Sequence, residues 1–154
     1  MNFRAIINEE YDKVLIEKFF DEVEIYQSNH YGAYNRNRLS RAYHVLPDYF
    51  KKTIAPNPML IKKLWRGADG IVNNYGAISF TDKRSNAAFY GTFAFPFSEL
   101  QSYGGLIDTH KVVLFATKYK IPVEIGDDEN EVIVIDPVWK PGLEDREENY
   151  RVHF

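Results

Sequence analysis

Residues 127–135 read DDENEVIVI, an acidic turn that leads directly into four β-branched residues in succession. β-branched side chains favour extended backbone, so the sequence predicts a strand over residues 131–135. In extended geometry Glu129 and Glu131 lie on one face of the chain, roughly 6.5 to 7 Å apart at the backbone. One substrate could then contact both carboxylates, one stabilising positive charge at a sugar carbon and the other positioning a nucleophile. Acidic residues before a strand are more often a solvated turn, so this pair needs support from other segments.

The first third of the chain has the pattern of helices. Apolar residues between about 9 and 27 recur at spacings of three and four, which is typical of an amphipathic helix, and residues 29–32 should end it. A second helix is expected over residues 33–43. It is followed by residues 46–50, where Pro47 suits the first turn of a helix.

The pattern changes after the Pro-Asn-Pro sequence at residues 56–58. A short helix is expected between Ser85 and Tyr90, and a long polar and aromatic connection from Ser98 to Gly105. The predicted strands cover residues 59–66, 77–81, 111–116, 121–125 and 131–135. Helices followed by strands favour one α+β domain over residues 1–154, with a helical part to about residue 55, a mainly β part over about 56–140 and a short carboxy-terminal tail.

Length and composition fit a single soluble domain. The chain has 154 residues, of which 45% are hydrophobic and 16% aromatic, enough for one packed core. It contains no cysteine, and its four histidines are far apart in sequence, so no metal site is indicated. No segment has the pattern of a signal peptide or a membrane span, so we expect a cytoplasmic protein. A net charge of −3 gives no general attraction to nucleic acid.

Two earlier segments place polar side chains at predicted strands. Arg66 and Gly67 follow an apolar run, and together they allow a guanidinium and a bare backbone to approach a ligand. Arginine suits a pyrophosphate, because its planar fork donates paired, charge-assisted hydrogen bonds. Ser79 and Thr81 are two residues apart in the next predicted strand, so they share a face. Taken singly, each of these features is more often structural.

The order of these segments resembles the signature of toxin-like mono-ADP-ribosyltransferases of the arginine–serine–glutamate class. An Arg-Gly after a strand, a Ser-x-Thr strand about a dozen residues later and a Glu-x-Glu before Val-Ile-Val-Ile carry the resemblance, which extends over about residues 60–135. The helical first third also resembles the amino-terminal helices of that family. The resemblance implies a split β-sandwich with flanking helices, in which two short sheets form a cleft for NAD.

Residue by residue, the resemblance implies an NAD site. Arg66 would hold the NAD phosphates and ribose, and the backbone of Gly67 would meet the nicotinamide amide. Ser79 would hydrogen-bond Glu131 and keep its catalytic carboxylate aimed at the nicotinamide ribose, where it stabilises an oxocarbenium-like transition state. Glu129, the first acid of Glu-x-Glu, implies arginine as the acceptor.

The chain departs from the family pattern at the serine strand. Residues 79–81 read SFT instead of Ser-Thr-Ser, so the second hydroxyl is lost and Thr81 replaces the third. The second family arginine corresponds to either Arg38 or Arg41. Phe89 is one of several aromatic residues that could stack on nicotinamide, although most of these residues are expected in the core.

The leading interpretation is an enzyme that transfers ADP-ribose from NAD to a guanidinium of a target protein, such as a phage-encoded or bacterial effector. Two alternatives stay open: NAD glycohydrolysis, in which water replaces the protein nucleophile, and a catalytically silent domain that binds a protein partner. Nucleic-acid binding through the basic residues of the first half is a weaker alternative, because such residues more often form a solvated face. No membrane partner is expected.

Overall fold

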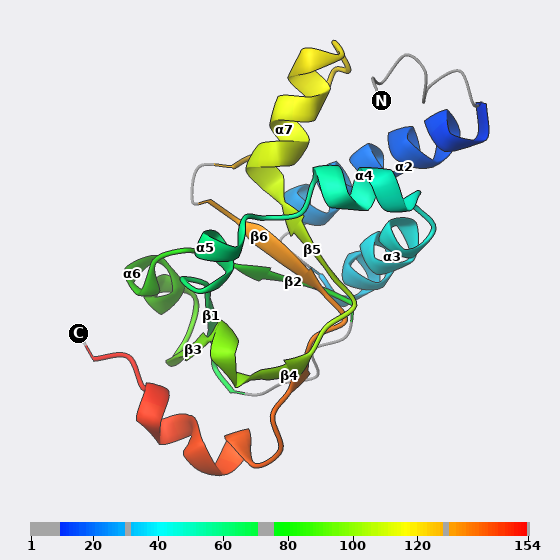
Figure 1. Ribbon diagram of the computed structural model, residues 1–154. Helices are drawn as coiled ribbons and strands as arrows, with labels where there is room; N and C mark the ends of the chain where they lie inside the picture. Colours follow the sequence, from blue (N-terminus) through cyan, green and yellow to red (C-terminus); the bar gives the residue numbers. More distant parts are fainter. Residues whose placement is uncertain (1–9, 30–31, 71–75, 128–129, 154) are drawn as a thin grey trace.

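The computed structural model describes residues 10–29, 32–70, 76–127 and 130–153 (Figure 1). Within these ranges the first elements are helices, as predicted: α2 (Glu10–Ser28), α3 (Ala33–His44) and α4 (Asp48–Thr53). The buried face of α2 is formed by residues at helical spacing, Ile16, Phe19, Phe20, Val23 and Tyr26. Val14, an apolar residue of the same helix, is exposed.

The later elements are shorter and mix helices with strands. They are α5 (Pro58–Ile61), β1 (Trp65–Ala68), β2 (Ala77–Phe80), α6 (Arg84–Ala87), η1 (Ala88–Tyr90), β3 (Phe93–Pro96), η2 (Phe97–Glu99), β4 (Leu100–Ser102), β5 (Gly105–Asp108), α7 (Thr109–Lys118), β6 (Val132–Ile135), β7 (Val138–Trp139) and the 3-10 helix η3 (Leu143–Tyr150). The general α+β class is therefore confirmed. None of the helices in the described part of the chain combines the length and apolar content needed to cross a membrane.

Within the described ranges, the strands form three small antiparallel sheets. Their orders are β1-β3, β2-β6-β5 and β4-β7. The predicted strand at residues 131–135 is the centre of the three-stranded sheet, with Ser79 of β2 and Ile107 of β5 opposite Ile133. A bridge between Trp65 and Thr81, with N···O distances of 2.7 and 2.9 Å, joins β1 to the end of β2. The first two sheets therefore adjoin at this point.

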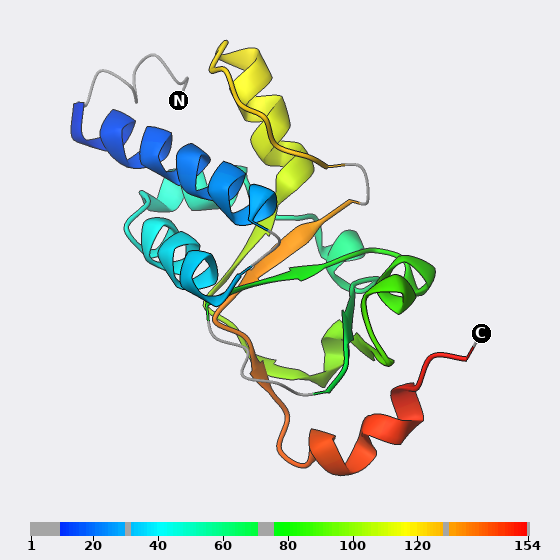
Figure 2. The same cartoon turned by 180° about the vertical axis from the view of Figure 1, so that it is seen from behind.

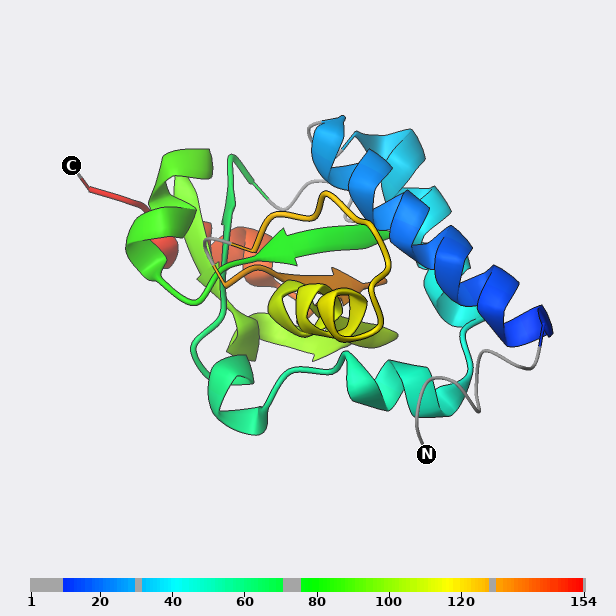
Figure 3. The ribbon, with the colours of Figure 1, turned by 90° about the horizontal axis from the view of Figure 1, so that it is seen from above.

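Alternate residues of β6 pack into two different hydrophobic cores. Ile133 and Ile135 face the core formed with the helices, while Val132 and Val134 pack into a second cluster with residues such as Leu106. Both faces of the strand are covered, so all four of its side chains are fully buried. Figure 1 shows α7 continuing from β5 above one end of this sheet, and Figure 3 shows the same helix from above; Figure 2 shows α2 beside α3 at one end of the molecule with η3 at the other.

The predicted strand at residues 111–116 is wrong, because these residues lie inside α7. The side chain of Asp108 caps this helix, accepting hydrogen bonds from the backbone N–H groups of His110 and Lys111 at 3.0 and 3.4 Å. The run has the look of a short strand, but the buried positions have helical spacing. They are Thr109, Val112, Phe115 and Ala116.

Other boundaries in the predicted β part also differ. The predicted strand at 59–66 is wrong over most of its length, since α5 occupies its start and β1 begins at Trp65. Residues 121–125 form no strand, although their alternating apolar side chains pack against the helical core. The expected connection at 98–105 contains β4 and the start of β5, and the expected tail contains η3. The short helix predicted at 85–90 is confirmed by α6 and η1.

Candidate functional site

Glu131 lies directly before β6 and is only 9% exposed. Its backbone oxygen accepts hydrogen bonds from the N–H and the hydroxyl of Thr109, at 3.1 and 2.8 Å, so the start of the strand is attached to the start of α7. The hydroxyl of Ser79 donates to Oε2 of Glu131. The pairing of β2 with β6 accounts for this contact, because it places Phe80 opposite Val132 and so brings the end of β2 beside Glu131. The structure thus brings together the serine and the glutamate that the resemblance paired.

The last turn of α2 supplies two further contacts that sequence reasoning missed. The hydroxyl of Tyr26 lies 2.8 Å from Oγ of Ser79, and Nε2 of Gln27 donates to Oε1 of Glu131 at 2.7 Å. These pairs are 53 and 104 residues apart in sequence. Tyr26 could be recognised only as part of the apolar helix face, and Gln27 carried no signal at all. Both oxygens of the Glu131 carboxylate therefore accept a hydrogen bond from a polar side chain.

Arg66 reaches the same site from the neighbouring strand β1. Its Nη1 donates to the backbone oxygen of Ser79 at 3.1 Å, and the side chain is half-buried. The guanidinium therefore lies against the strand whose hydroxyl orients Glu131. Arg66, Ser79 and Glu131 form one constellation built from β1, β2 and the start of β6.

Gly67 has a packing role in the structure. A Cβ atom at this position would lie 1.9 Å from the backbone oxygen of Ala87 in α6. The close approach of α6 to β1 therefore requires a glycine here. Thr81 is buried and pairs its backbone with Trp65. That the Gly67 backbone meets nicotinamide, and that Thr81 contributes to the NAD site, stay predictions.

The two candidates for the second arginine both lie on α3. Arg38 donates from Nη2 to Oε1 of Glu22 at 2.6 Å, and Glu22 is 3% exposed. The hydrogen bond to Glu22 and the negative charge of that carboxylate raise the pKa of Arg38 above its ordinary value. Arg38 thus forms an ion pair between α3 and α2. Arg41 is exposed in the last turn of α3.

The acidic turn is attached at both ends to neighbouring elements. Asp127 lies 2.8 Å from Nδ1 of His110 on α7, and the amide of Asn130 donates to Asp82 at 3.0 Å. Asn130 has a φ of 50°, in the left-handed region that asparagine tolerates better than most residues. Glu129, the proposed acceptor-facing acid, lies outside the described residues.

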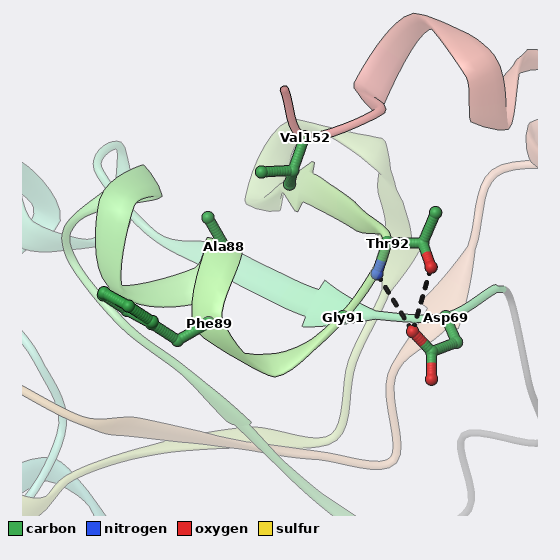
Figure 4. A pocket seen from close by; sticks show the side chains of 6 residues that line it. All are labelled: Asp69, Ala88, Phe89, Gly91, Thr92 and Val152. Carbon is green, nitrogen blue, oxygen red and sulfur yellow. Dashed lines mark hydrogen bonds between the residues drawn. The ribbon is translucent and has the colours of Figure 1, made fainter. Parts of the chain in front are cut away.

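A separate open hollow lies beside β1 and η1 (Figure 4). Its volume is about 480 Å³. Asp69 accepts hydrogen bonds from the N–H and the hydroxyl of Thr92 at 3.0 and 3.1 Å on its wall. Among the predicted site residues that the structure describes, Phe89, which is 79% exposed, lines the hollow, whereas Glu131, Ser79 and Arg66 do not. The side-chain chemistry of the Glu131 constellation, rather than the concavity, therefore identifies the candidate site.

We compared the chain with protein-family models, with curated proteins and with solved structures, and found no significant match. The function is therefore inferred from the residues of the site. A shielded carboxylate aimed by a hydroxyl and an amide can stabilise positive charge that develops on a substrate carbon. A guanidinium one strand away suits an anionic group of the same substrate.

Proposed function

We propose that this chain transfers ADP-ribose from NAD to an arginine side chain of a protein acceptor and releases nicotinamide. The hydrogen bond from Ser79 to the shielded carboxylate of Glu131 carries this proposal, since it is the contact expected of an orienting serine and a catalytic glutamate. Arg66, which contacts the backbone of Ser79, supports it with a cation for the NAD phosphates.

An ADP-ribosyltransferase-like split β-sandwich belongs to the same proposal. Two features of the fold support it: helices precede the strands, and the sheets β1-β3 and β2-β6-β5 adjoin at the bridge between Trp65 and Thr81. In this arrangement Arg66 and Ser79 come from adjoining sheets. A substrate could therefore contact both sheets at once.

In the proposed reaction the bond between the ribose carbon and the nicotinamide nitrogen breaks. The bonding electron pair leaves with nicotinamide and neutralises its positively charged ring, while positive charge develops on the ribose carbon. The carboxylate of Glu131 stabilises that charge. A guanidinium nitrogen of the acceptor then forms the new bond to this carbon and loses a proton, for which Glu129 is the proposed base.

The remaining NAD contacts are assigned within the same proposal. Arg66 binds the phosphates and Thr81 adds a hydroxyl-bearing residue at the end of β2. The exposed ring of Phe89 lines the separate hollow, so it would stack only on a part of NAD that extends into that hollow. Of the two candidate arginines on α3, we favour Arg41 as the second cation. Arg38 is already paired with Glu22, and leaving that carboxylate buried without its partner would be costly.

The test is an assay of the purified chain with labelled NAD and an arginine-containing acceptor protein. Glu131→Gln should lower nicotinamide release and label transfer by about 10² to 10³, because an electrostatic stabiliser of the transition state is lost. Its melting temperature should stay close to that of the wild type. Glu124→Gln, the same substitution at an exposed position seven residues earlier, is the matched control and should leave both rates unchanged.

Three results would contradict the proposal. Turnover of Glu131→Gln within a few-fold of the wild type excludes Glu131 as the catalytic carboxylate. Nicotinamide release without any label on protein identifies the activity as NAD glycohydrolysis. If calorimetry detects no NAD binding at all, the catalytically silent protein-binding domain becomes the better interpretation.

A further inference from the structure

We propose that Gln27 is a positioning residue that holds the carboxylate of Glu131 in a fixed position relative to the backbone of Gly126. This inference rests on the proposed function only in taking Glu131 as the catalytic group. The resemblance to a known family did not include Gln27.

The side-chain amide of Gln27 is held by the backbone of Gly126. Its Oε1 accepts from the Gly126 N–H at 2.9 Å, and its Nε2 donates to the Gly126 oxygen at 2.9 Å. The amide group is planar, so these two hydrogen bonds set its orientation and with it the direction of the remaining N–H. That N–H points at Oε1 of Glu131, 2.7 Å away. The reversed amide would place its oxygen against the carboxylate, so the network allows one orientation.

Gln27 removes a rotational freedom that Ser79 alone leaves open. The terminal torsion of a glutamate is broad, so a single donor to Oε2 does not hold the plane of the carboxylate. A second donor from a different element fixes both oxygens, one by β2 and the other by α2. The preceding residue Tyr26 contacts Ser79 in turn, so the end of α2 supports both members of the pair.

The same amide also connects the two ends of the acidic turn. Gly126 precedes the turn and Glu131 follows it, and Gln27 bonds to both. The position of Gly126 relative to the carboxylate is therefore set by α2. A residue that orients the group acting on NAD should affect turnover more than NAD binding.

Two substitutions separate these contacts. Gln27→Met has a similar length but neither donates nor accepts a strong hydrogen bond, so it loses all three contacts. Gln27→Glu keeps an acceptor for the Gly126 N–H but loses the donor to Glu131 and adds a like charge beside it. Gln101→Met, at the exposed second glutamine of the chain on β4, is the matched control.

The experiment measures kcat and KM for nicotinamide release, the melting temperature, and hydrogen exchange of the Gly126 amide. Gln27→Met should lower kcat by about 10- to 100-fold with KM within a few-fold, and its Gly126 amide should lose protection. Gln27→Glu should lower kcat at least as much while Gly126 stays protected. Gln101→Met should match the wild type in every measurement.

Three outcomes would overturn the inference. The first is an unchanged kcat in Gln27→Met. The second is a Gln27→Glu variant with wild-type kcat, since the contact with Gly126 alone would then be enough for full turnover. The third is a parallel loss of kcat, NAD affinity and melting temperature, which indicates a structural role only. A wild-type protein that releases no nicotinamide would refute the proposed function instead. In that case the positioning role is tested by a crystal structure of Gln27→Met, and an unmoved Glu131 carboxylate would refute it.

Discussion

The guanidinium of Arg66 contacts the backbone oxygen of Ser79 through one nitrogen and has several other donors. If these bind the NAD phosphates, Arg66→Lys should weaken NAD binding although the net charge is unchanged, because lysine lacks the planar fork. Calorimetry of the two proteins measures the difference directly. Equal NAD affinities would leave Arg66 with a structural role only, whereas a lower melting temperature would show that its contact with Ser79 also supports the fold.

The two acids of the Glu-x-Glu segment should differ in their effects. Glu131 acts on NAD, so every product of glycosidic cleavage requires it, whereas Glu129 is proposed to act on the acceptor guanidinium, a poor nucleophile while protonated. Glu129→Gln should therefore abolish transfer to arginine and spare much of the slow hydrolysis of NAD. Both rates are measured in one protein preparation. An equal decrease in both would place Glu129 at NAD or in the fold, and undiminished transfer would argue against arginine as the acceptor.

The contact between β1 and α6 depends on the missing side chain of Gly67. In Gly67→Ala the new Cβ would meet the backbone of Ala87, which can move only if α6 moves. We expect the free energy of unfolding to fall by about 1 to 3 kcal/mol, as is typical of overpacking. Chemical denaturation of the variant and the wild type measures this change. Gly70→Ala, where a Cβ would make only an ordinary contact at 3.8 Å, should change stability much less.

The carboxy-terminal 3-10 helix η3 is joined to the rest of the molecule through Glu99. This buried carboxylate accepts hydrogen bonds from Arg146 at 3.0 and 3.2 Å and from the hydroxyl of Tyr150 at 2.7 Å, while Leu143 of η3 packs against Phe93. Burial alone would raise the pKa of Glu99, but the hydrogen bonds from Tyr150 and Arg146 outweigh it and lower the pKa below its ordinary value. The ionised form of Glu99 therefore stabilises the docking of η3.

A lowered pKa in the folded state gives a definite pH dependence of stability. The contribution of Glu99 is fully present above the ordinary glutamate pKa of about 4.3 and is lost as the pH falls through the lower pKa of the folded protein. Between about pH 6 and about pH 3, the melting temperature of the wild type should thus fall more than the melting temperature of Glu99→Gln, which has no carboxyl group to titrate at this position. Glu148→Gln, which removes an exposed ion pair with Arg151, should change stability little at neutral pH. Identical pH profiles for wild type and Glu99→Gln would contradict this assignment.

Local patterns in the sequence determined the elements in which the spacing of apolar residues matches the faces that are buried in the fold. The apolar spacing before residue 28 predicted α2, and the β-branched run after Glu131 predicted β6, which is buried on both faces. The same reasoning failed at α7, where the apparent strand propensity of residues 111–116 suggested the wrong element. The capping residue Asp108 and the helical spacing of the buried side chains were present in the sequence, and they outweighed that propensity.

The tertiary structure alone decided which side chains surround Glu131. Family resemblance could pair Ser79 with Glu131, but the contacts of Tyr26 and Gln27 depend on where α2 packs against the sheet. The tertiary structure also pairs Arg38 with Glu22, an ion pair that the sequence of α3 does not reveal. The physical reason is the separation of the residues in sequence. Helix and strand periodicity reports on neighbours a few residues apart. The hydrogen bond from Gln27 to Glu131 joins residues 104 apart, and such a contact exists only after the helices and the sheet have packed.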